Sequence, residues 1–128
     1  MLPARHRMRR GRDFAQAVRR GRRCGRPTLV GHLWQDAQSS SPPLVGFVVS
    51  RAVGPAVVRA RTKRRLRHLV SDRLRSLPEG TLLVIRANPP AAQAPSAGLS
   101  SDLDAVLQRL LPPTAVSGPE LDRVGGSR

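Results

Sequence analysis

Apolar and polar positions along this chain repeat with two periods, and each period predicts its own kind of element. Apolar residues that recur every three or four positions predict amphipathic helices at 13–20, 57–75 and 101–111. Runs rich in apolar and β-branched residues predict strands at 28–34, 44–50 and 81–86. The middle helix lies between the second and third strands, and such a strand–helix–strand unit packs its helix on one face of a sheet.

The residues at the ends of two helical segments predict where those helices begin and end. Asp13 is placed to cap the first helix, and Gly21 is a natural stop for it. Ser101 is placed to cap the last helix, with Asp102 and Asp104 in its first turn.

The remaining segments divide the chain into one domain and a tail. The strand at 44–50, LVGFVVS, is apolar at most positions, which predicts a central strand covered on both faces. Residues 1–11 form a basic arm that we expect to be extended or loosely ordered, and 87–98, with three prolines, predicts a mobile loop. Residues 112–128 lack periodicity and predict a disordered tail. We therefore expect one α+β domain over 1–111, with three helices around one sheet.

The charge of the chain is strongly positive and unevenly placed. Lys and Arg number 23 against 8 Asp and Glu, which gives a formal net charge of +15. Ten arginines lie within 5–26, and nine basic residues lie within 51–75. This excess is typical of proteins that bind nucleic acid or an anionic membrane. A GC-rich genome explains an arginine excess equally well, so composition alone does not decide whether the chain binds a polyanion.

The helix predicted at 57–75 carries a different chemistry on each face. Its apolar stripe consists of Leu66, Leu69, Val70, Leu74 and Leu77. The opposite face presents Arg61, Arg64, Arg65, His68 and Arg75, and the stripe is flanked by Lys63 and Arg67. Asp72 is the only acid between Gly54 and Leu77, so the basic face lacks the ion pairs of an ordinary solvated helix. We expect this face to contact nucleic acid, because a membrane-surface helix needs a larger apolar face and no run reaches membrane-spanning length.

Side chains suited to catalysis are few and scattered. The histidines, which are far apart in sequence, are His6, His32 and His68. The close acidic pair, Asp102 and Asp104, fits helix capping better than metal binding, and no metal site is expected. Cys24 is the only cysteine, which excludes an internal disulfide and fits a reducing compartment. We interpret the chain as an RNA- or DNA-binding protein rather than an independent catalyst.

One stretch resembles the signature of a known family. The sequence VGFVVSRAVGPAVVRARTKRRLRHLV, at 45–70, is similar to the bacterial ribonuclease P protein subunit, in which a strand leads into a glycine turn, an Arg-Asn-Arg motif and a Lys-Arg cluster. The N-terminal RMRRGRDFAQAVRRGRR, at 7–23, resembles the basic opening of the same family. The likeness covers 2–111.

The resemblance implies a fold and an activity. The family fold has a four-stranded sheet and three helices in the order αβββαβα, is related to a ribosomal-protein domain, and contains a left-handed β-α-β crossover. It implies a fourth strand that the pattern does not locate. The family acts in a ribonucleoprotein whose catalytic RNA removes the 5′ leader of precursor tRNA with Mg²⁺ held mainly by the RNA. The implied setting is cytoplasmic, with no obligatory protein partner and no membrane. The alternative is a non-catalytic basic RNA-binding protein of the ribosome-associated type.

The resemblance also assigns residues by matching positions. Those implied to bind RNA are Arg59, Arg61, Lys63, Arg64, Arg65, Arg67, Arg51, Arg9, Arg10 and Arg12. Phe14 and His32 match positions of a leader-binding cleft, where a ring can stack on an unpaired base, although Phe14 fits core packing equally well. Ala60 replaces the Asn of the motif, and Ala52 and Val18 replace a usual Lys and a common aromatic. These departures predict looser leader recognition.

Overall fold

The computed structural model describes residues 2–111, and the predicted tail at 112–128 lies outside the described residues. The elements follow the order α1 (Gly11–Arg20), β1 (Arg22–Gly25), β2 (Leu29–Gln35), β3 (Leu44–Val48), α2 (Ala56–Ser71), β4 (Thr81–Ala87) and α3 (Ser96–Leu110). They are accompanied by short 3₁₀ turns, η1 (Ala4–His6), η2 (Arg51–Val53), η3 (Leu74–Ser76) and η4 (Pro89–Ala92). The predicted α+β class and the order αβββαβα are confirmed.

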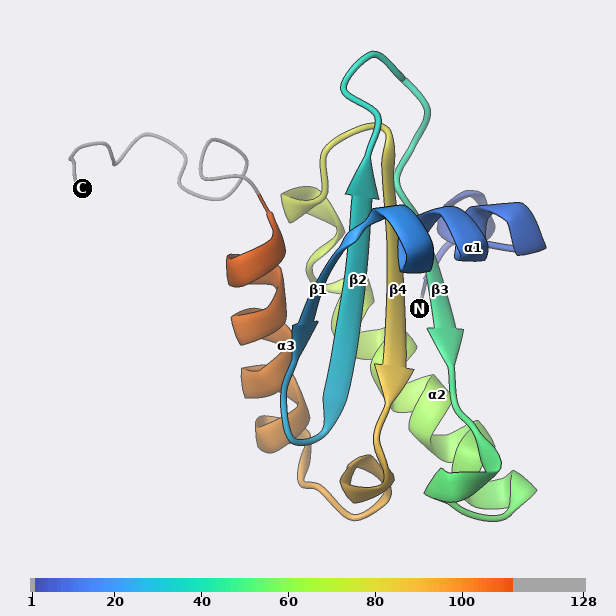
Figure 1. The fold of residues 1–128 in the computed structure, drawn as a ribbon. Helices are drawn as coiled ribbons and strands as arrows, with labels where there is room; N and C mark the ends of the chain where they lie inside the picture. Colours follow the sequence, from blue (N-terminus) through green and yellow to red (C-terminus); the bar gives the residue numbers. More distant parts are fainter. Residues whose placement is uncertain (1, 112–128) are drawn as a thin grey trace, which may run out of the picture.

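Within the described residues, the strands form one four-stranded mixed sheet in the order β1-β2-β4-β3 (Figure 1). β2 is antiparallel to both β1 and β4, whereas β3 is parallel to β4. The prediction that 44–50 forms a central strand is therefore wrong, because β3 lies at an edge. Its apolar character has another cause: the N-terminal arm lies along it, with an Arg7–Val45 bridge and a 2.9 Å hydrogen bond from Met8 N to Val45 O. Leu2 and Met8 are buried, so the arm is packed rather than loose.

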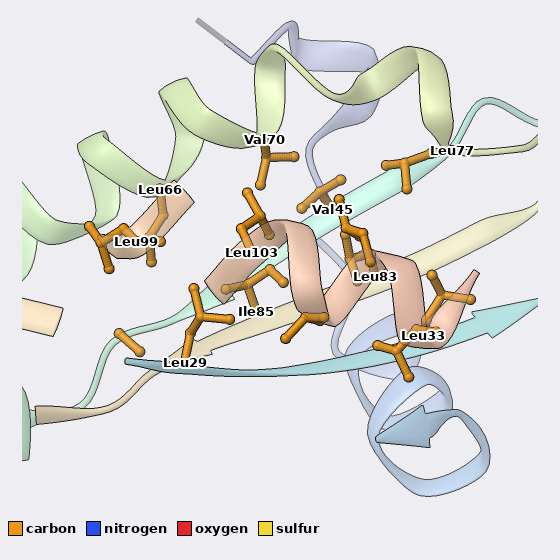
Figure 2. Packing of buried hydrophobic residues seen from close by; sticks show 14 of the residues in the cluster. Leu29, Leu33, Val45, Leu66, Val70, Leu77, Leu83, Ile85, Leu99 and Leu103 are labelled. Atoms are coloured by element: carbon orange, nitrogen blue, oxygen red, sulfur yellow. The ribbon is translucent and has the colours of Figure 1, made fainter. Parts of the chain in front are cut away.

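The helices divide between the two faces of the sheet. α2 and α3 cover one face, and α1 crosses the other face near one end (Figure 1). Under α2 and α3, Leu66 and Val70 meet Leu103 and the inward-facing Leu83 and Ile85 of β4 (Figure 2). All five side chains are fully buried, and each contributes about 1.5–3 kcal/mol by leaving water. This core fixes the side of α2 that faces away from solvent.

The unit β3–α2–β4 has an unusual hand. β3 and β4 are parallel neighbours, and in Figure 1 both point downward with α2 behind the sheet and β4 to the left of β3. That arrangement is left-handed, whereas about 98% of such crossovers are right-handed. The expectation carried by the family resemblance is confirmed, and no periodicity in the sequence signals it.

The strand that the pattern did not locate is β1, with the sequence Arg-Arg-Cys-Gly. Sequence analysis assigns no element to this region, because two of its four residues are arginines and no apolar alternation is visible. Pairing with β2 makes it a strand, and Arg22 extends across to α3. The Arg22 guanidinium donates to the carbonyls of Arg109 and Leu110 at 2.9 and 3.2 Å, at the end of that helix.

Two helices begin before the residues that sequence predicts as their caps. α1 begins at Gly11, so Asp13 lies in its first turn and no side-chain hydrogen bond caps the helix. α3 begins at Ser96, which places Ser101 inside the helix and makes the prediction that it caps α3 wrong. An acidic residue near a helix start stabilises the positive end of the dipole, so Asp13 keeps a helix-stabilising position without being a cap.

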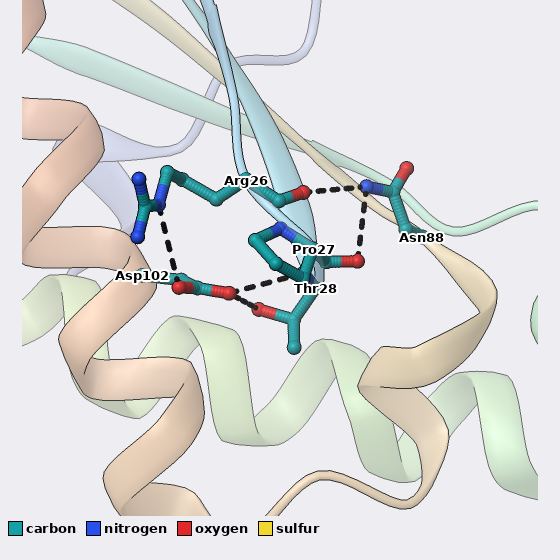
Figure 3. Close-up of polar contacts among 5 residues, drawn as sticks. All are labelled: Arg26, Pro27, Thr28, Asn88 and Asp102. Carbon is teal, nitrogen blue, oxygen red and sulfur yellow. Dashed lines mark hydrogen bonds and ion pairs between the residues drawn. The ribbon is translucent and has the colours of Figure 1, made fainter.

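Asp102 joins α3 to β2 rather than occupying the first turn of a helix. Its carboxylate accepts hydrogen bonds from Thr28 N at 3.0 Å and Thr28 Oγ1 at 2.7 Å, and Arg26 Nε lies 3.5 Å away (Figure 3). Asn88 Nδ2 donates to the carbonyls of Arg26 and Pro27 from the other side of the turn (Figure 3). Both Thr28 and Asp102 are buried. The hydrogen bonds, led by that of the Thr28 hydroxyl, lower the pKa of Asp102.

Two arginines of the α2 region hold segments that follow it. Arg65 donates to the carbonyls of Ala91 and Ala94 at 3.4 and 2.5 Å. Arg73 Nε lies 2.6 Å from Asp104 Oδ1 of α3, so Asp104 forms an ion pair instead of capping the helix. The segment after β4 contains η4, in which Ala91 is fully buried, in place of the irregular loop that its prolines predict.

Candidate nucleic-acid interface

The burial of α2 determines which of its cations reach solvent. Thr62, Leu66 and Val70 face inward and are buried. On the opposite side, Arg61 and Arg64 are exposed, and neither side chain forms a hydrogen bond or ion pair with another residue of 2–111. The predicted two-faced helix is therefore present, although it ends at Ser71 and the last part of the predicted segment forms η3. Exposed guanidinium groups without acidic partners are suited to bidentate contacts with phosphate.

Two of the cations assigned to α2 are hydrogen-bonded to the protein itself, and a third is half-buried. Arg59 Nε donates to Gly54 O at 3.1 Å, where the chain turns into the helix. Arg65 is half-buried and bonded to the segment after β4, so it does not project with Arg61 and Arg64 as the helical spacing predicts. Arg67 is also half-buried, with no partner among the described residues. The basic face is thus narrower than its sequence suggests.

Two hollows meet at α2, and two side chains line both of them. One has a volume of about 350 Å³ and is lined by Val49, Ala56, Arg59, Ala60, Lys63, Arg64 and Arg67. The other, about 330 Å³, is lined by Leu2, Arg7, Met8, Arg9, Phe14, Val45, Gly46, Phe47, Lys63 and Arg67. Because Lys63 and Arg67 border both, the basic helix and Phe14 belong to one continuous surface. Sequence analysis places these residues in two separate sites.

Phe14 packs in a core cluster and also borders a hollow, so its position is compatible with both of the roles that sequence analysis leaves open. It is half-buried and packs on a small cluster under α1 with Met8, Ala17 and Val84. Its ring lies over Gly46 of β3, where an added Cβ would come within 2.5 Å of two ring atoms. The ring also borders the hollow beside Lys63. Gly46 is therefore a residue that positions Phe14, and no sequence pattern identifies it.

His32 lies on the same sheet face as α1 but is not in the Phe14 hollow. Gly31 packs under Val106 of α3, and alternation along β2 places His32 on the opposite face. Arg23 of β1 is directly opposite His32, and Arg86 of β4 lies on the same face. Burial, followed by these two cations, lowers the pKa of His32, whose Nδ1 has no hydrogen-bond partner among residues 2–111. His32 as a whole is 7% exposed, which limits stacking of its ring on a base.

The other predicted RNA-binding residues lie around the N-terminal arm and the turn before α2. Arg9 borders the Phe14 hollow, and all three of Arg9, Arg10 and Arg12 are exposed around a further cavity at the start of α1. Arg51 is exposed in η2. No group of three His, Cys, Asp or Glu side chains gathers in residues 2–111. No helix in the same range is long and apolar enough to cross a membrane.

Arg23 and Arg86 are cations that sequence analysis did not assign to a site. Their proximity to His32 depends on the pairing of β1 and β4 with β2. Arg86 is exposed on a strand whose other residues are buried or half-buried, and a single cation in this apolar run was the signal that sequence analysis could have used. The sequence contained no comparable signal for Arg23, because the strand that carries it was not predicted.

Comparison with known proteins relates this geometry to one family. The sequence profile of the family described as Ribonuclease P matches residues 2–111. The ribonuclease P protein component of Streptomyces bikiniensis is 59% identical over 118 residues, covering 87% of this chain and 96% of that protein. The component from Nocardioides sp. is 55% identical over 111 residues, covering 86% of this chain and 95% of that protein.

Solved structures support the fold. The RNase P protein of Staphylococcus aureus aligns with a TM-score of 0.72 at 20% sequence identity, covering 81% of this chain and 94% of its own. The RNase P protein from Thermotoga maritima aligns with a TM-score of 0.71 at 21% identity, covering 84% of this chain and all of its own. At this identity the alignments carry the fold alone.

Proposed function

Because this chain belongs to the ribonuclease P protein family, we propose that it assists a catalytic RNA in removing the 5′ leader from precursor tRNA. Ribonuclease P is an endoribonuclease of tRNA maturation. In the proposal, the RNA subunit carries the catalysis, the protein binds RNA and leader, and no further protein is obligatory. The assembly acts in the cytoplasm.

The junction of the two hollows at Lys63 and Arg67 is the observation that carries this proposal. A leader strand that leaves the Phe14 hollow reaches the basic face of α2 past Lys63 and Arg67, and no acidic residue lines either hollow. The protein therefore brings a single-stranded segment and a structured RNA to the same place. A general RNA binder needs only one of these surfaces.

Each part of the surface has its own task. Phe14 offers a ring on which an unpaired base stacks, which is worth about 1–3 kcal/mol per base. Arg61 and Arg64 bind phosphates of the catalytic RNA, and each neutralised phosphate releases counterions, so affinity falls steeply with salt. Lys63 and Arg67 lie where the two RNA segments meet and offset the repulsion between their phosphates.

The proposal places Mg²⁺ mainly on the RNA. The described residues offer no gathered set of carboxylates or imidazoles that would hold a divalent cation unaided. When bound, such an ion neutralises developing charge on the phosphate and activates the attacking water. The chain's own contribution is to position the leader and to hold the RNA beside it.

Reconstitution tests this function. The purified chain is mixed with a bacterial catalytic RNA of the ribonuclease P type at low Mg²⁺, and cleavage of a 5′-extended precursor tRNA is followed. We expect stimulated cleavage at the mature 5′ end, and loss of stimulation in Arg61→Ala/Arg64→Ala. The control is Arg20→Ala/Arg109→Ala, which removes the same charge at two exposed positions away from α2. Equal stimulation by both variants, or none by the wild type, contradicts the proposal.

A ribosome-associated RNA-binding role is the second candidate, and Ala60 is the observation that favours it. Ala60 borders the α2 hollow where the family motif has an amide side chain. With catalytic RNA present, the second candidate predicts equal binding of precursor and mature tRNA. Because Ala60 is exposed, we expect Ala60→Asn to leave the unfolding midpoint unchanged and to tighten precursor binding. An unchanged affinity would show that this position is silent.

A further inference from the structure

A cavity of about 590 Å³ lies at the end of the sheet beside the start of α1, away from the α2 hollow. It is enclosed by the N-terminal arm, the start of α1, the loop between β2 and β3, and the start of β4. The lining includes Arg7, Arg9, Arg10, Arg12, Trp34 and Ser39. Its volume falls in the range of about 300–1,000 Å³ that holds small ligands.

Backbone contacts fix two walls of this cavity. Gly80, at φ +79°, donates to Ser41 O at 2.8 Å and accepts from Asp36 N at 3.0 Å, which holds the β2–β3 loop against β4. A side chain at Gly80 would overlap Asp36 O, so the contact requires glycine. On the other wall, His6 Nδ1 lies 2.8 Å from Pro43 O. The cavity is therefore formed before any ligand arrives.

The charges that line the cavity favour an anion. Arg9, Arg10 and Arg12 are exposed, and none of their guanidinium groups has a hydrogen bond or ion pair to a described residue. Arg7 uses only its Nε, which donates to Leu2 O at 3.0 Å. Four guanidinium groups face two lining carboxylates, those of Asp13 and Asp36. Free guanidinium groups with a net positive surplus match the geometry and charge of phosphate.

Trp34 adds a second and different recognition element. It is half-buried at the outer end of β2, on the sheet face that carries α1, and its indole borders the cavity. An indole beside several arginines is the combination that binds single-stranded nucleic acid, with the base on the ring and the phosphate on the cations. Arg7 and Arg9 also line the Phe14 hollow, so one strand can occupy both places.

We propose that this cavity binds one unpaired nucleotide of an RNA strand, with its base against Trp34 and its phosphates on Arg9, Arg10 and Arg12. The inference extends the proposed function and rests on it for the identity of the polymer. It adds a contact point beyond the basic face of α2 and the Phe14 hollow. Nucleotide chemistry is shared by free nucleotides, but the continuity with the Phe14 hollow favours a strand.

Trp34 is the only tryptophan and the chain has no tyrosine, so its emission reports on this cavity alone. The test titrates the full chain with an oligoadenylate ribonucleotide of about six nucleotides. A base stacked on the indole quenches its emission, and we expect saturable quenching. Arg10→Gln/Arg12→Gln should raise the quenching Kd by about tenfold or more, because charge-assisted hydrogen bonds are lost. The matched control, Arg19→Gln/Arg20→Gln, removes the same charge from the exposed far end of α1 and should change the Kd by less than about twofold.

Two further measurements distinguish the outcomes. Binding of the same oligonucleotide is followed by anisotropy of a label on the RNA. Binding without quenching, or equal weakening in both double variants, overturns the proposal, while stimulation of precursor cleavage still tests the proposed function separately. Adenosine 5′-monophosphate is the second probe. We expect it to bind more weakly than the oligonucleotide, and equal affinity would reassign the cavity to a free nucleotide and overturn the assignment to RNA.

Discussion

Arg64 and Arg65 are neighbours on α2 with the same side chain, and the structure predicts opposite consequences for their removal. The Arg64 side chain is exposed and has no hydrogen bond to a described residue, whereas the Arg65 guanidinium donates to the carbonyls of Ala91 and Ala94. Arg64→Ala should weaken binding to the catalytic RNA and leave the free energy of unfolding within about 0.5 kcal/mol. Arg65→Ala should destabilise the fold.

The expected loss for Arg65→Ala follows from its two hydrogen bonds. Bonds from a charged donor contribute about 1.5–3 kcal/mol each when well formed. One of these is long, at 3.4 Å, and the side chain is only half-buried, so solvent screening reduces the sum to about 1–2 kcal/mol. With a urea dependence of about 2 kcal/mol per molar, the midpoint should fall by roughly 0.5–1 M.

Urea unfolding followed by circular dichroism measures the midpoint, and a filter-binding titration with the catalytic RNA measures affinity. Arg64→Ala serves as the control for Arg65→Ala, because the helix and the charge change are the same. The reasoning is refuted if Arg65→Ala unfolds at the wild-type midpoint and loses as much RNA affinity as Arg64→Ala. Arg65 would then be a free phosphate contact, as the helical spacing predicts.

Further predictions concern the polar bridge, the buried histidine and the leader hollow. The hydrogen bond from the Thr28 hydroxyl lowers the pKa of Asp102, so the stability that this carboxylate contributes is present above its ordinary pKa of 3.8 and is lost as pH falls below 3.8 through the lowered pKa. Asp102→Asn should lower the free energy of unfolding at pH 7 by about 1–3 kcal/mol and should make that free energy depend less on pH in the acid range. Burial lowers the pKa of His32, so wild-type stability should decrease as pH falls below about 6.5, and His32→Gln should remove that slope in thermal melts. Gly46→Ala places a methyl group against Phe14, which should cost about 1–3 kcal/mol and weaken precursor binding while mature tRNA binding is unchanged; equal weakening of both would show that Phe14 does not contact the leader.

Much of the fold follows from periodicity because burial imposes it. The stripe of α2 and the strand at 81–86 were predicted since their apolar positions face a core, and the structure has α2 and β4 there. β1 was not predicted because two of its four residues are arginines, and it is a strand because its backbone pairs with β2. The start of α3 was predicted too late in the sequence, because Asp102 looked like a residue of the first helical turn. Its carboxylate instead accepts hydrogen bonds from Thr28, a tertiary contact that the local sequence does not indicate. Handedness came only from family resemblance.

The candidate site was predictable in its residue types and not in its grouping. A cluster of cations on α2 is visible in the sequence, but which of them are free depends on contacts with η4 and on the turn at Gly54. The joining of Phe14 to Lys63 depends on the position of the N-terminal arm along β3, which lies far from α2 in sequence. Long-range packing of this kind leaves no local pattern.

The central claim is that leader and catalytic RNA meet on one surface at Lys63 and Arg67. The most direct test compares the affinity of the complex of chain and catalytic RNA for precursor tRNA with its affinity for mature tRNA. The account predicts tighter binding of the precursor, and a reduced difference in Phe14→Leu, which keeps an apolar side chain but removes the stacking ring. Equal affinities for the two tRNAs in the wild-type complex would contradict it and leave a basic RNA-binding domain without leader recognition.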